Sequence, residues 1–512
     1  MNIIEKYADK INGVLETFDR MIINGYILQL CNYRQFLYYL IQNNVKLVDF
    51  AKFAEDQTKS LCTHIDNYVR ENEIEIQYLP SGKVNKGELA LQGLAGNTTK
   101  TGLVSAFSVV ETCNTMTVKS NYESKQLEVV SRPTKCKHYY LYYNDIEFGW
   151  MFLKIQTWFP YNIQIYINGR EYLSKILDRN NIEYAMYDNS FAYIEDFEKA
   201  QQLADGILNK KITDSLDGIA SKINNLVPNI KSVFYHSYYW CVDQCEFATD
   251  INFKSRDDLS GIYKTLVETS FFTFSSQDIY SFFGRRLDRI YSFKKGEIIS
   301  DLRRRDQGFR VKFKINKNQV KMYDKGNNLR IEVTINNPRD FKILKPEVDR
   351  ETGEVLETKK WVPMGKSMAN LYRYVEISKS IINRFINALP EIDADRVPLK
   401  ELTTVSTRKE VNGRSYSAFN ILNDNTIKIF IALADGAFII NGFNNKLLRR
   451  KIFTDGDSKP NIGRTTRLIA KLRAHRVIKK VPKSNKYYLT TNGRKIINCI
   501  LIYTNKTLVN VG

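Results

Sequence analysis

Residues 308–335 read GFRVKFKINKNQVKMYDKGNNLRIEVTI, and this stretch decides the fold class of the middle of the chain. It holds three runs of β-branched and aromatic residues, separated by NKN at 316–318 and by GN at 326–327. Asn and Gly are residue types of tight turns, so the pattern predicts three consecutive antiparallel strands. Pro338 ends the third strand, because proline cannot donate a hydrogen bond to a sheet ladder.

Strand-like runs also fill residues 102–168, where short apolar stretches alternate with turn residues. Their spacing predicts an antiparallel meander. Helical spacing returns at 170–179 and about 195–226, with a strand pair predicted near 182–194. The stretch YYWCVDQCEFATDINF, at 238–253, is again strand-like. Strands and helices that alternate in this irregular way indicate the α+β class.

At the start of the chain the apolar residues recur with the period of a helix and not of a strand. Apolar residues from Ile3 to Val14 recur at helical spacing, and Asn24-Gly25 is a turn signal, so residues 1–73 are predicted to be helical. We therefore expect five regions: a helical N-terminal region at 1–100, an antiparallel α+β domain at 101–228, a second α+β section at 229–345, a hairpin, helix and linker at 346–420, and a final domain at 421–512.

Positive charge is concentrated in the final domain. The 512 residues hold 76 Lys or Arg and 56 Asp or Glu, which is a net charge of +20. Residues 423–512 alone hold 18 basic and four acidic residues, a net charge of +14. The bias of an AT-rich genome toward Lys and Asn codons is the alternative cause of the overall excess, but it would spread the charge evenly. The concentration therefore favours a polyanionic partner.

The order of elements in this domain is informative. The sequence predicts helices at 424–434, 444–453 and 462–475, a hairpin with its tip at 483–485, and a last helix from Thr491. This order resembles the winged-helix family, and the ending LTTNGRKI resembles the version found in MarR-type regulators. The resemblance implies that the third helix enters the major groove of duplex DNA.

The third helix divides into two faces. Leu468, Ile469 and Leu472 are predicted to face a core, and basic residues fall on the other side. The residues expected to bind nucleic acid are Arg464, Arg467 and Lys471 on this helix and Lys479, Lys480, Lys483 and Lys486 on the hairpin. Arg side chains suit guanine edges, and the hairpin lysines suit the flanking phosphates. RNA binding and a solvated basic face on a protein–protein module are the alternatives.

Two stretches in the middle of the chain resemble the rolling-circle replication initiators of plasmids and filamentous phages. Those families show a Tyr-x-Lys run and then an Arg-x-Glu on the next strand. The matching residues here are Tyr323, Lys325, Arg330 and Glu332. The stretch CVDQCEFATDINF, at 241–253, is similar to their early acidic strand. Its acidic residues are Asp243, Glu246 and Asp250.

The resemblance implies a metal-dependent enzyme that nicks DNA or transfers a strand. Tyr323 would attack a phosphodiester, and Lys325 or Arg330 would stabilise the developing phosphate charge. The carboxylates implied as ligands of Mg²⁺ or Mn²⁺ are Glu246, Asp250 and Glu332. The alternative is a β-hairpin platform in which Arg330 and Glu332 merely flank a strand.

Longer stretches, at 137–173 and 329–342, resemble a family of bacterial proteins associated with mobile elements. The first of them interleaves aromatic and basic residues, a combination that suits the stacking of single-stranded bases. The residues expected to stack are Tyr140, Tyr142 and Trp158. The same pattern is equally typical of a β-domain core, and both interpretations stay open.

Several classes of protein are disfavoured. Seven scattered cysteines without a Cys-x-x-Cys pair predict neither a disulfide framework nor a structural zinc site. The four histidines form no His-hydrophobe-His pair, which disfavours the HUH nucleases, and no P-loop occurs. Without a signal peptide or a run of 18 apolar residues, we expect no membrane segment and a reducing cytoplasm.

Taken together, the patterns predict an α+β protein that acts on DNA in replication or mobile-element movement. Duplex DNA would bind the winged helix, and single-stranded DNA the core. The alternative is a non-catalytic binder, either a transcriptional regulator or an RNA-binding scaffold.

Overall fold

The computed structural model describes residues 2–94, 101–209, 211–274, 276–284, 298–305, 308–348, 355–389, 405–420, 423–455, 457–498 and 500. It has the mixed α+β composition that the sequence predicts. The chain divides into two compact units: unit 1 holds residues 1–14, 249–333 and 379–512, and unit 2 holds residues 15–248 and 334–378. Strands β1, β9 and β13 and helix α12 contribute residues to both units.

Most strands belong to one sheet, hydrogen-bonded in the order β10-β11-β12-β13-β9-β1-β6-β5-β4-β3-β2. Their bounds are β1 Ile11–Tyr26, β2 Ile76–Leu79, β3 Gly102–Ser120, β4 Leu127–Asp145, β5 Gly149–Gln156, β6 Ile163–Asn168, β9 Tyr239–Phe253, β10 Ile298–Arg305, β11 Gly308–Ile315, β12 Asn318–Lys325 and β13 Asn328–Ile335. Separate two-stranded sheets are formed by β7 Tyr184–Met186 with β8 Phe191–Ile194, β14 Lys342–Val348 with β15 Val355–Pro363, β16 Lys409–Val411 with β17 Arg414–Tyr416, and β18 Ile478–Lys480 with β19 Tyr487–Leu489.

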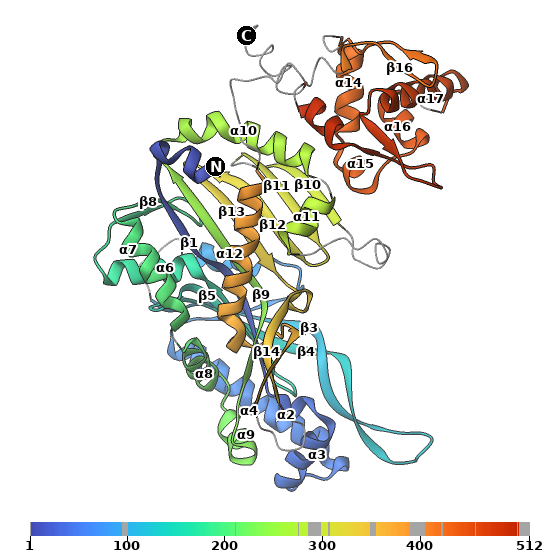
Figure 1. Cartoon of the computed structure of the whole chain (residues 1–512). Helices are drawn as coiled ribbons and strands as arrows, with labels where there is room; N and C mark the ends of the chain where they lie inside the picture. The colour runs from blue at the N-terminus through green and yellow to red at the C-terminus, as the bar shows by residue number, and fades with distance from the viewer. Residues whose placement is uncertain are drawn as a thin grey trace. The chain divides into compact units, whose positions relative to one another are not determined.

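The meander predicted at 102–168 is confirmed within unit 2. Strands β3 to β6 pair in chain order and antiparallel, and β2 joins the edge parallel to β3. The hairpin of β3 and β4 extends well beyond its neighbours (Figure 1). It pairs over its full length, with Val109 opposite His138 and Glu111 opposite Cys136.

Helices cover the sheet in unit 2. Helix α4 packs aromatic side chains against the meander, with Phe50 and Phe53 beside Phe159. Helix α5 contributes Ala90 to a core with Phe107 and Tyr142. The helices of this unit are α2 Leu28–Cys31, α3 Tyr33–Gln42, α4 Phe50–Glu71, α5 Lys86–Leu94, α6 Gly169–Arg179, α7 Phe197–Gly206, α8 Ile212–Ile223 and α9 Val227–Phe234.

Unit 1 buries its part of the sheet under a cluster of phenylalanines. Phe274, Phe282 and Phe385 meet Phe313 of β11 with ring centroids 5.6 to 6.3 Å from it. These rings follow or belong to α10 Arg256–Thr273, α11 Ser276–Phe282 and α12 Leu371–Ala388. The unit also holds α1 Ile3–Lys6 at the start of the chain and, near its end, α14 Asp424–Leu433, α15 Gly436–Asn441, α16 Asn445–Ile452 and α17 Lys459–Ala474.

The predicted helices over residues 11–26 are wrong, because these residues form strand β1. Every second side chain from Leu15 to Ile23 is buried, which is the period of a strand, and Phe18 on the other face is buried as well. Thr17 and Asp19 occupy that buried face, so the apolar alternation is interrupted in the sequence. Gly25 is not in a turn, because it lies inside β1 and a Cβ there would come 2.6 Å from the Trp240 ring.

The remaining elements largely follow prediction. The strand pair near 182–194 and the helix within 366–389 are present, and the hairpin predicted at 346–363 is present with a first strand that begins earlier, at Lys342. Residues 409–416 form a small hairpin where a linker was expected. The rest of that linker, at 390–404, and the end of the final domain, at 501–512, lie outside the described residues. None of the described helices is long and apolar enough to cross a membrane.

Candidate nucleic-acid interface and polar centres

Residues 423–500 pack around a hydrophobic core to which Val405 and Phe419 also contribute. Helices α14, α15, α16 and α17 are followed by the hairpin β18–β19 and by helical residues 491–498. Phe430, Leu448, Leu472 and Leu489 are among the buried residues of this core. The three predicted helices, the hairpin and the last helix are thus present, and the short helix α15 is an addition that the sequence analysis missed.

A short backbone bridge completes the hairpin. Phe443, between α15 and α16, exchanges two backbone hydrogen bonds with Tyr487 of β19, at 2.9 and 2.7 Å. The preceding Gly442 has φ of +69°, and a Cβ there would lie 2.8 Å from the Tyr487 carbonyl oxygen. Glycine at this position therefore permits the close approach of the two chain segments.

Helix α17 buries one face, as predicted. Thr465, Ile469 and Leu472 are buried, whereas Arg464, in the first half of the helix, and Arg467, at its middle, are exposed. Arg464 reaches only its own helix, with Nη1 3.4 Å from the Asn461 side-chain oxygen. Among the residues that the structure describes, neither arginine has a carboxylate partner. Their positive charge is therefore not cancelled within the protein.

The other basic residue predicted on this helix is engaged elsewhere. Lys471 is half-buried, donates to the Ala418 carbonyl at 2.9 Å and lies 4.0 Å above the Phe419 ring. Burial lowers the pKa of Lys471. His475 hydrogen-bonds the Ser417 carbonyl oxygen at 3.0 Å through its Nε2 atom. The end of α17, from Lys471 to the C-cap His475, thus contacts residues 417–419, whereas Arg464 and Arg467 are exposed.

Other basic residues of the segment are neutralised. Asp457 accepts hydrogen bonds from Arg450 Nη2 at 2.6 Å and from Arg449 Nη2 at 2.9 Å. The bond from Arg450, followed by that from Arg449, lowers the pKa of Asp457 to about 2. In contrast, the four lysines predicted on the hairpin are exposed and have no carboxylate partner within the described part of the chain. They are Lys479, Lys480, Lys483 and Lys486.

A buried ion pair lies in the sheet of unit 1. Arg330 on β13 donates Nε to Oδ1 of Asp250 at 2.7 Å and Nη2 to Oδ2 at 2.9 Å. The Arg330 side chain is fully buried, and the Asp250 side chain is 3% exposed. A bidentate pair fixes the orientation of both groups, because two parallel hydrogen bonds define one geometry.

A second buried carboxylate in unit 1 belongs to Glu332, two residues along β13. It accepts hydrogen bonds from Lys321 and Tyr323, which both lie on β12. Burial raises the pKa of Glu332, but the charge and hydrogen bond of Lys321 and the hydroxyl of Tyr323 lower it more, so the net pKa lies well below its usual range. Lys325 is buried as well, with Nζ 5.9 Å from the centre of the Tyr323 ring.

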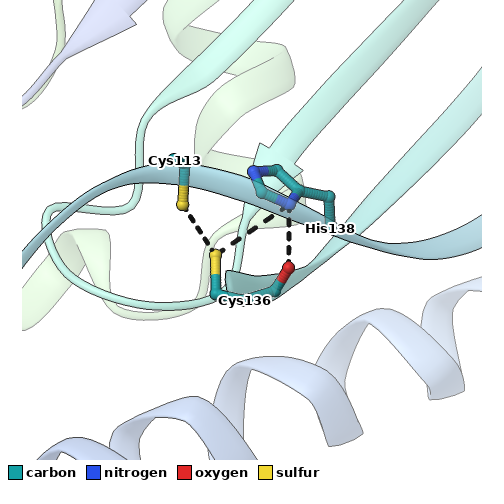
Figure 2. A group of neighbouring side chains, drawn as sticks. All are labelled: Cys113, Cys136 and His138. Carbon is teal, nitrogen blue, oxygen red and sulfur yellow. Dashed lines mark hydrogen bonds between the residues drawn. The ribbon is translucent and has the colours of Figure 1, made fainter. Parts of the chain in front are cut away.

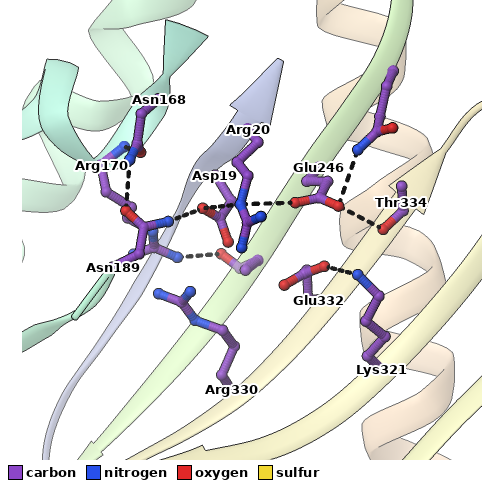
Figure 3. A network of polar contacts seen from close by, with 12 residues as sticks. Asp19, Arg20, Asn168, Arg170, Asn189, Glu246, Lys321, Arg330, Glu332 and Thr334 are labelled. Atoms are coloured by element: carbon purple, nitrogen blue, oxygen red, sulfur yellow. Dashed lines mark hydrogen bonds and ion pairs between the residues drawn. The ribbon is translucent and has the colours of Figure 1, made fainter. Parts of the chain in front are cut away.

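Unit 2 contains a further acidic pair. Glu246 accepts hydrogen bonds from Gln244 at 3.1 Å and Thr334 at 3.3 Å. Asp19 is fully buried, and its carboxylate approaches that of Glu246 to within 4.8 Å. The Arg20 Nε atom lies 3.5 Å from Glu246 and 4.0 Å from Asp19, so one cation serves two carboxylates (Figure 3). Asn189 donates a further hydrogen bond to Asp19.

Each carboxylate predicted to bind a metal is thus ion-paired with a basic side chain: Glu246 with Arg20, Asp250 with Arg330, and Glu332 with Lys321. Glu246 belongs to unit 2, and the other two belong to unit 1. The sequence placed Glu246 and Asp250 correctly on strand β9 and Glu332 on β13. The sequence could not show which basic side chains pair with these carboxylates. The positive charges of these partners balance the negative charges that were predicted to bind a metal ion.

The aromatic residues predicted to stack bases lie inward. Tyr140 and Tyr142 are 9% and 5% exposed, in the core that includes Ala90 of α5. Tyr140 donates to Glu111 at 2.9 Å, and Lys86 lies 4.5 Å above its ring. Trp158 is half-buried and donates Nε1 to the Met116 carbonyl at 3.0 Å. The burial of Tyr140 and Tyr142 leaves little ring surface on which a base could stack.

A cluster that the sequence analysis missed lies on the β3–β4 hairpin. Cys113 and Cys136 bring their sulfurs to 2.9 Å, and His138 Nδ1 lies 3.9 Å from the Cys136 sulfur (Figure 2). The sequence signal is small, because Cys136 and His138 form only a Cys-x-His pair and Cys113 lies 23 residues earlier. The hairpin register was needed to bring the three together.

Comparison of the chain with protein-family models, with curated proteins and with solved structures found no match.

Proposed function

We propose that the chain binds duplex DNA through residues 423–500. In this proposal the first half of α17 enters the major groove, and the hairpin β18–β19 lies on the neighbouring phosphates. The observation that carries the proposal is the exposure of Arg464 and Arg467 on α17, ahead of Lys471 in the helix, without carboxylate partners among the described residues. Residues near the beginning of a recognition helix are the ones that reach base edges.

The order of elements supports the proposal. A winged helix has a first helix, a short strand, two further helices and then a hairpin, and its short strand pairs with the last strand of that hairpin. Here α14 precedes the Phe443 bridge to β19, and α16, α17, β18 and β19 follow in that order. Helix α15, between α14 and the bridge, is an addition to that arrangement.

The distribution of charge also supports it. Arg449 and Arg450 pair with Asp457, and Lys471 contacts residues 418–419, so these three cations stabilise the protein itself. Six other exposed cations lie on α17 and the hairpin, the two elements expected to contact DNA. They are Arg464, Arg467, Lys479, Lys480, Lys483 and Lys486; further exposed cations, among them Arg473, lie on other sides of the segment. If all six contact phosphates, the slope of log affinity against log salt is roughly −5.

The test measures the binding of the full chain to duplex DNA at several salt concentrations, with fluorescence anisotropy as the readout. Arg464→Ala and Arg467→Ala should each weaken binding and reduce the magnitude of the salt slope by about 0.9 for a phosphate contact. If either side chain reads a base, its loss should cost about 1–3 kcal/mol more on the preferred sequence than on random DNA. Arg473→Ala is the matched control, because Arg473 is exposed on another side of the same helix.

Three outcomes would contradict the proposal. These are affinity that does not depend on salt, equal losses for Arg473→Ala and Arg467→Ala, or tighter binding to double-stranded RNA than to DNA of the same sequence. The last would favour the RNA-binding alternative, since an A-form major groove is too narrow for a helix.

A further inference from the structure

The Cys113, Cys136 and His138 side chains lie on the hairpin of β3 and β4, within unit 2. Cys136 and His138 are two residues apart on one strand, so they share a face, and Cys113 projects from the neighbouring strand. One candidate ligand atom from each residue lies within 4.8 Å of the other two. The three groups are thus held by paired backbone rather than by a loop, which fixes their spacing.

These groups have the chemistry of a soft or borderline metal site. Thiolate sulfur and imidazole nitrogen are ligands that zinc takes in tetrahedral sites. The thiolate is the form that binds metals.

The surroundings of His138 also suit a ligand. Its ring is buried, and Nδ1 lies 3.1 Å from the Cys136 carbonyl oxygen, which can accept a hydrogen bond from it. A metal-binding histidine usually donates its other ring nitrogen to a carbonyl or carboxylate in this way, which fixes the tautomer. The tautomer that donates from Nδ1 leaves the Nε2 lone pair for a metal.

We propose that Cys113, Cys136 and His138 bind one Zn²⁺ ion and thereby cross-link strands β3 and β4. The three protein ligands leave a fourth position for water. Tetrahedral zinc with bonds of about 2.3 Å keeps two sulfurs roughly 3.8 Å apart, so the sulfurs must separate by about 1 Å from their distance in the metal-free pair. Cys113 is half-buried, so its side chain is not fully enclosed.

An ion can reach the cluster from solvent. Both cysteines are half-buried, and Cys136 lines a cavity of about 580 Å³ together with residues of the α4 region such as Phe50 and Thr58. Arg132, Lys135 and Lys137 also line this cavity. These positive side chains favour the thiolate form of a nearby cysteine over the thiol. Two thiolates neutralise the charge of one zinc ion, so the cations do not repel the ion once it is bound in this way.

The experiment measures metal in the full chain purified under reducing conditions. After equilibration with zinc and dialysis, we expect about one zinc per chain by elemental analysis. Cobalt in place of zinc should give the thiolate-to-cobalt charge-transfer absorption. Cys113→Ser, Cys136→Ser and His138→Gln should each lose the bound zinc, with affinity falling by more than the roughly 10–100-fold that loss of an outer-shell partner costs.

Cys241→Ser is the matched control, because Cys241 is a half-buried strand cysteine of the same unit outside the cluster. It should keep the zinc. Circular dichroism checks that each variant is folded, and protection of two thiols from alkylation by added zinc gives a second readout in the unmodified chain. The proposal is overturned if zinc content is unchanged in the folded Cys136→Ser variant. It is also overturned if the unmodified chain binds copper(I) but no zinc, or if the thiols are protected only by oxidation to a disulfide.

Discussion

Arg330 and Asp250 form a bidentate ion pair in the interior of unit 1, with Nε–Oδ1 and Nη2–Oδ2 distances of 2.7 and 2.9 Å. The two residues lie 80 positions apart in the chain, on β13 and β9. Removing water from two charges is costly, and the pair remains favourable only because both charges are matched in geometry. Two residues predicted to act in a nicking site thus fix one another's orientation in this structure.

Loss of one partner of this pair should strongly destabilise the protein. In Asp250→Ala the Arg330 guanidinium keeps its buried place but loses its counter-ion, so we expect a loss of about 3–5 kcal/mol in the free energy of unfolding. Denaturant unfolding followed by circular dichroism measures it. Arg373→Ala, which breaks the exposed pair with Glu376, is the control and should cost no more than about 1 kcal/mol. Equal effects of the two substitutions would show that the buried pair is not structural.

Glu332 should make stability fall in acid. Its pKa in the folded protein is lowered, so its ionised form contributes stability above the unfolded pKa of about 4.3, and that contribution is lost as the pH falls toward the folded value. The difference in unfolding free energy between the unmodified chain and Glu332→Gln should therefore be largest near neutral pH and shrink below about pH 4. Unfolding curves across this range test it. A difference that grows in acid would contradict the sign of the shift.

The main role of Tyr323 should be to stabilise the folded protein. Its hydroxyl donates to the Glu332 carboxylate, and a hydrogen bond to a charged group contributes about 1.5–3 kcal/mol. Tyr323→Phe should lose that amount and leave DNA binding unchanged, whereas Tyr122→Phe, at a residue that is 95% exposed, should lose nothing. Denaturing electrophoresis after incubation with supercoiled DNA and Mn²⁺ tests the other role. A protein–DNA adduct that disappears in Tyr323→Phe would identify this tyrosine as a nucleophile.

The aromatic residues of β4 should behave as core. Tyr142 is 5% exposed and packs against Phe107 with ring centroids 5.8 Å apart. Tyr142→Ala should cost about 3–5 kcal/mol of unfolding free energy, as large-to-small aromatic substitutions in cores do. Tyr122→Ala is the exposed control. A melting curve beside a single-strand binding curve separates the roles, since a stacking residue would lose about 1–3 kcal/mol of binding with stability unchanged.

Two glycines of the final segment should respond in opposite directions to alanine. A Cβ on Gly493 would lie 2.0 Å from the Val477 carbonyl oxygen, so Gly493→Ala must displace backbone and should destabilise the segment. A Cβ on Gly463, inside α17, would meet nothing closer than 3.9 Å. Gly463→Ala should therefore stabilise the segment by roughly 0.5–1 kcal/mol through helix propensity. Protection of amides in α17 by hydrogen exchange measures both effects.

Local patterns in the sequence predicted much of the fold. The strands within 102–168 and 308–335 were predicted because each hairpin is closed by a short turn, so the residues that pair are close in the chain. The two faces of α17 were predicted because helical spacing depends on neighbouring residues alone. Strand β1 was not predicted, because Thr17 and Asp19 interrupt its apolar face.

The sequence by itself determined the α+β class, most of the strands and helices after residue 102, and the concentration of basic residues near the end of the chain. Only the tertiary structure decided which charges meet. Asp250 is paired with Arg330, and Lys471 is turned toward residues 418–419, although both Asp250 and Lys471 had been expected to face a ligand. The physical reason is that periodicity specifies the face on which a side chain lies. Its partner comes from a segment many residues away, whose position depends on how the whole chain packs.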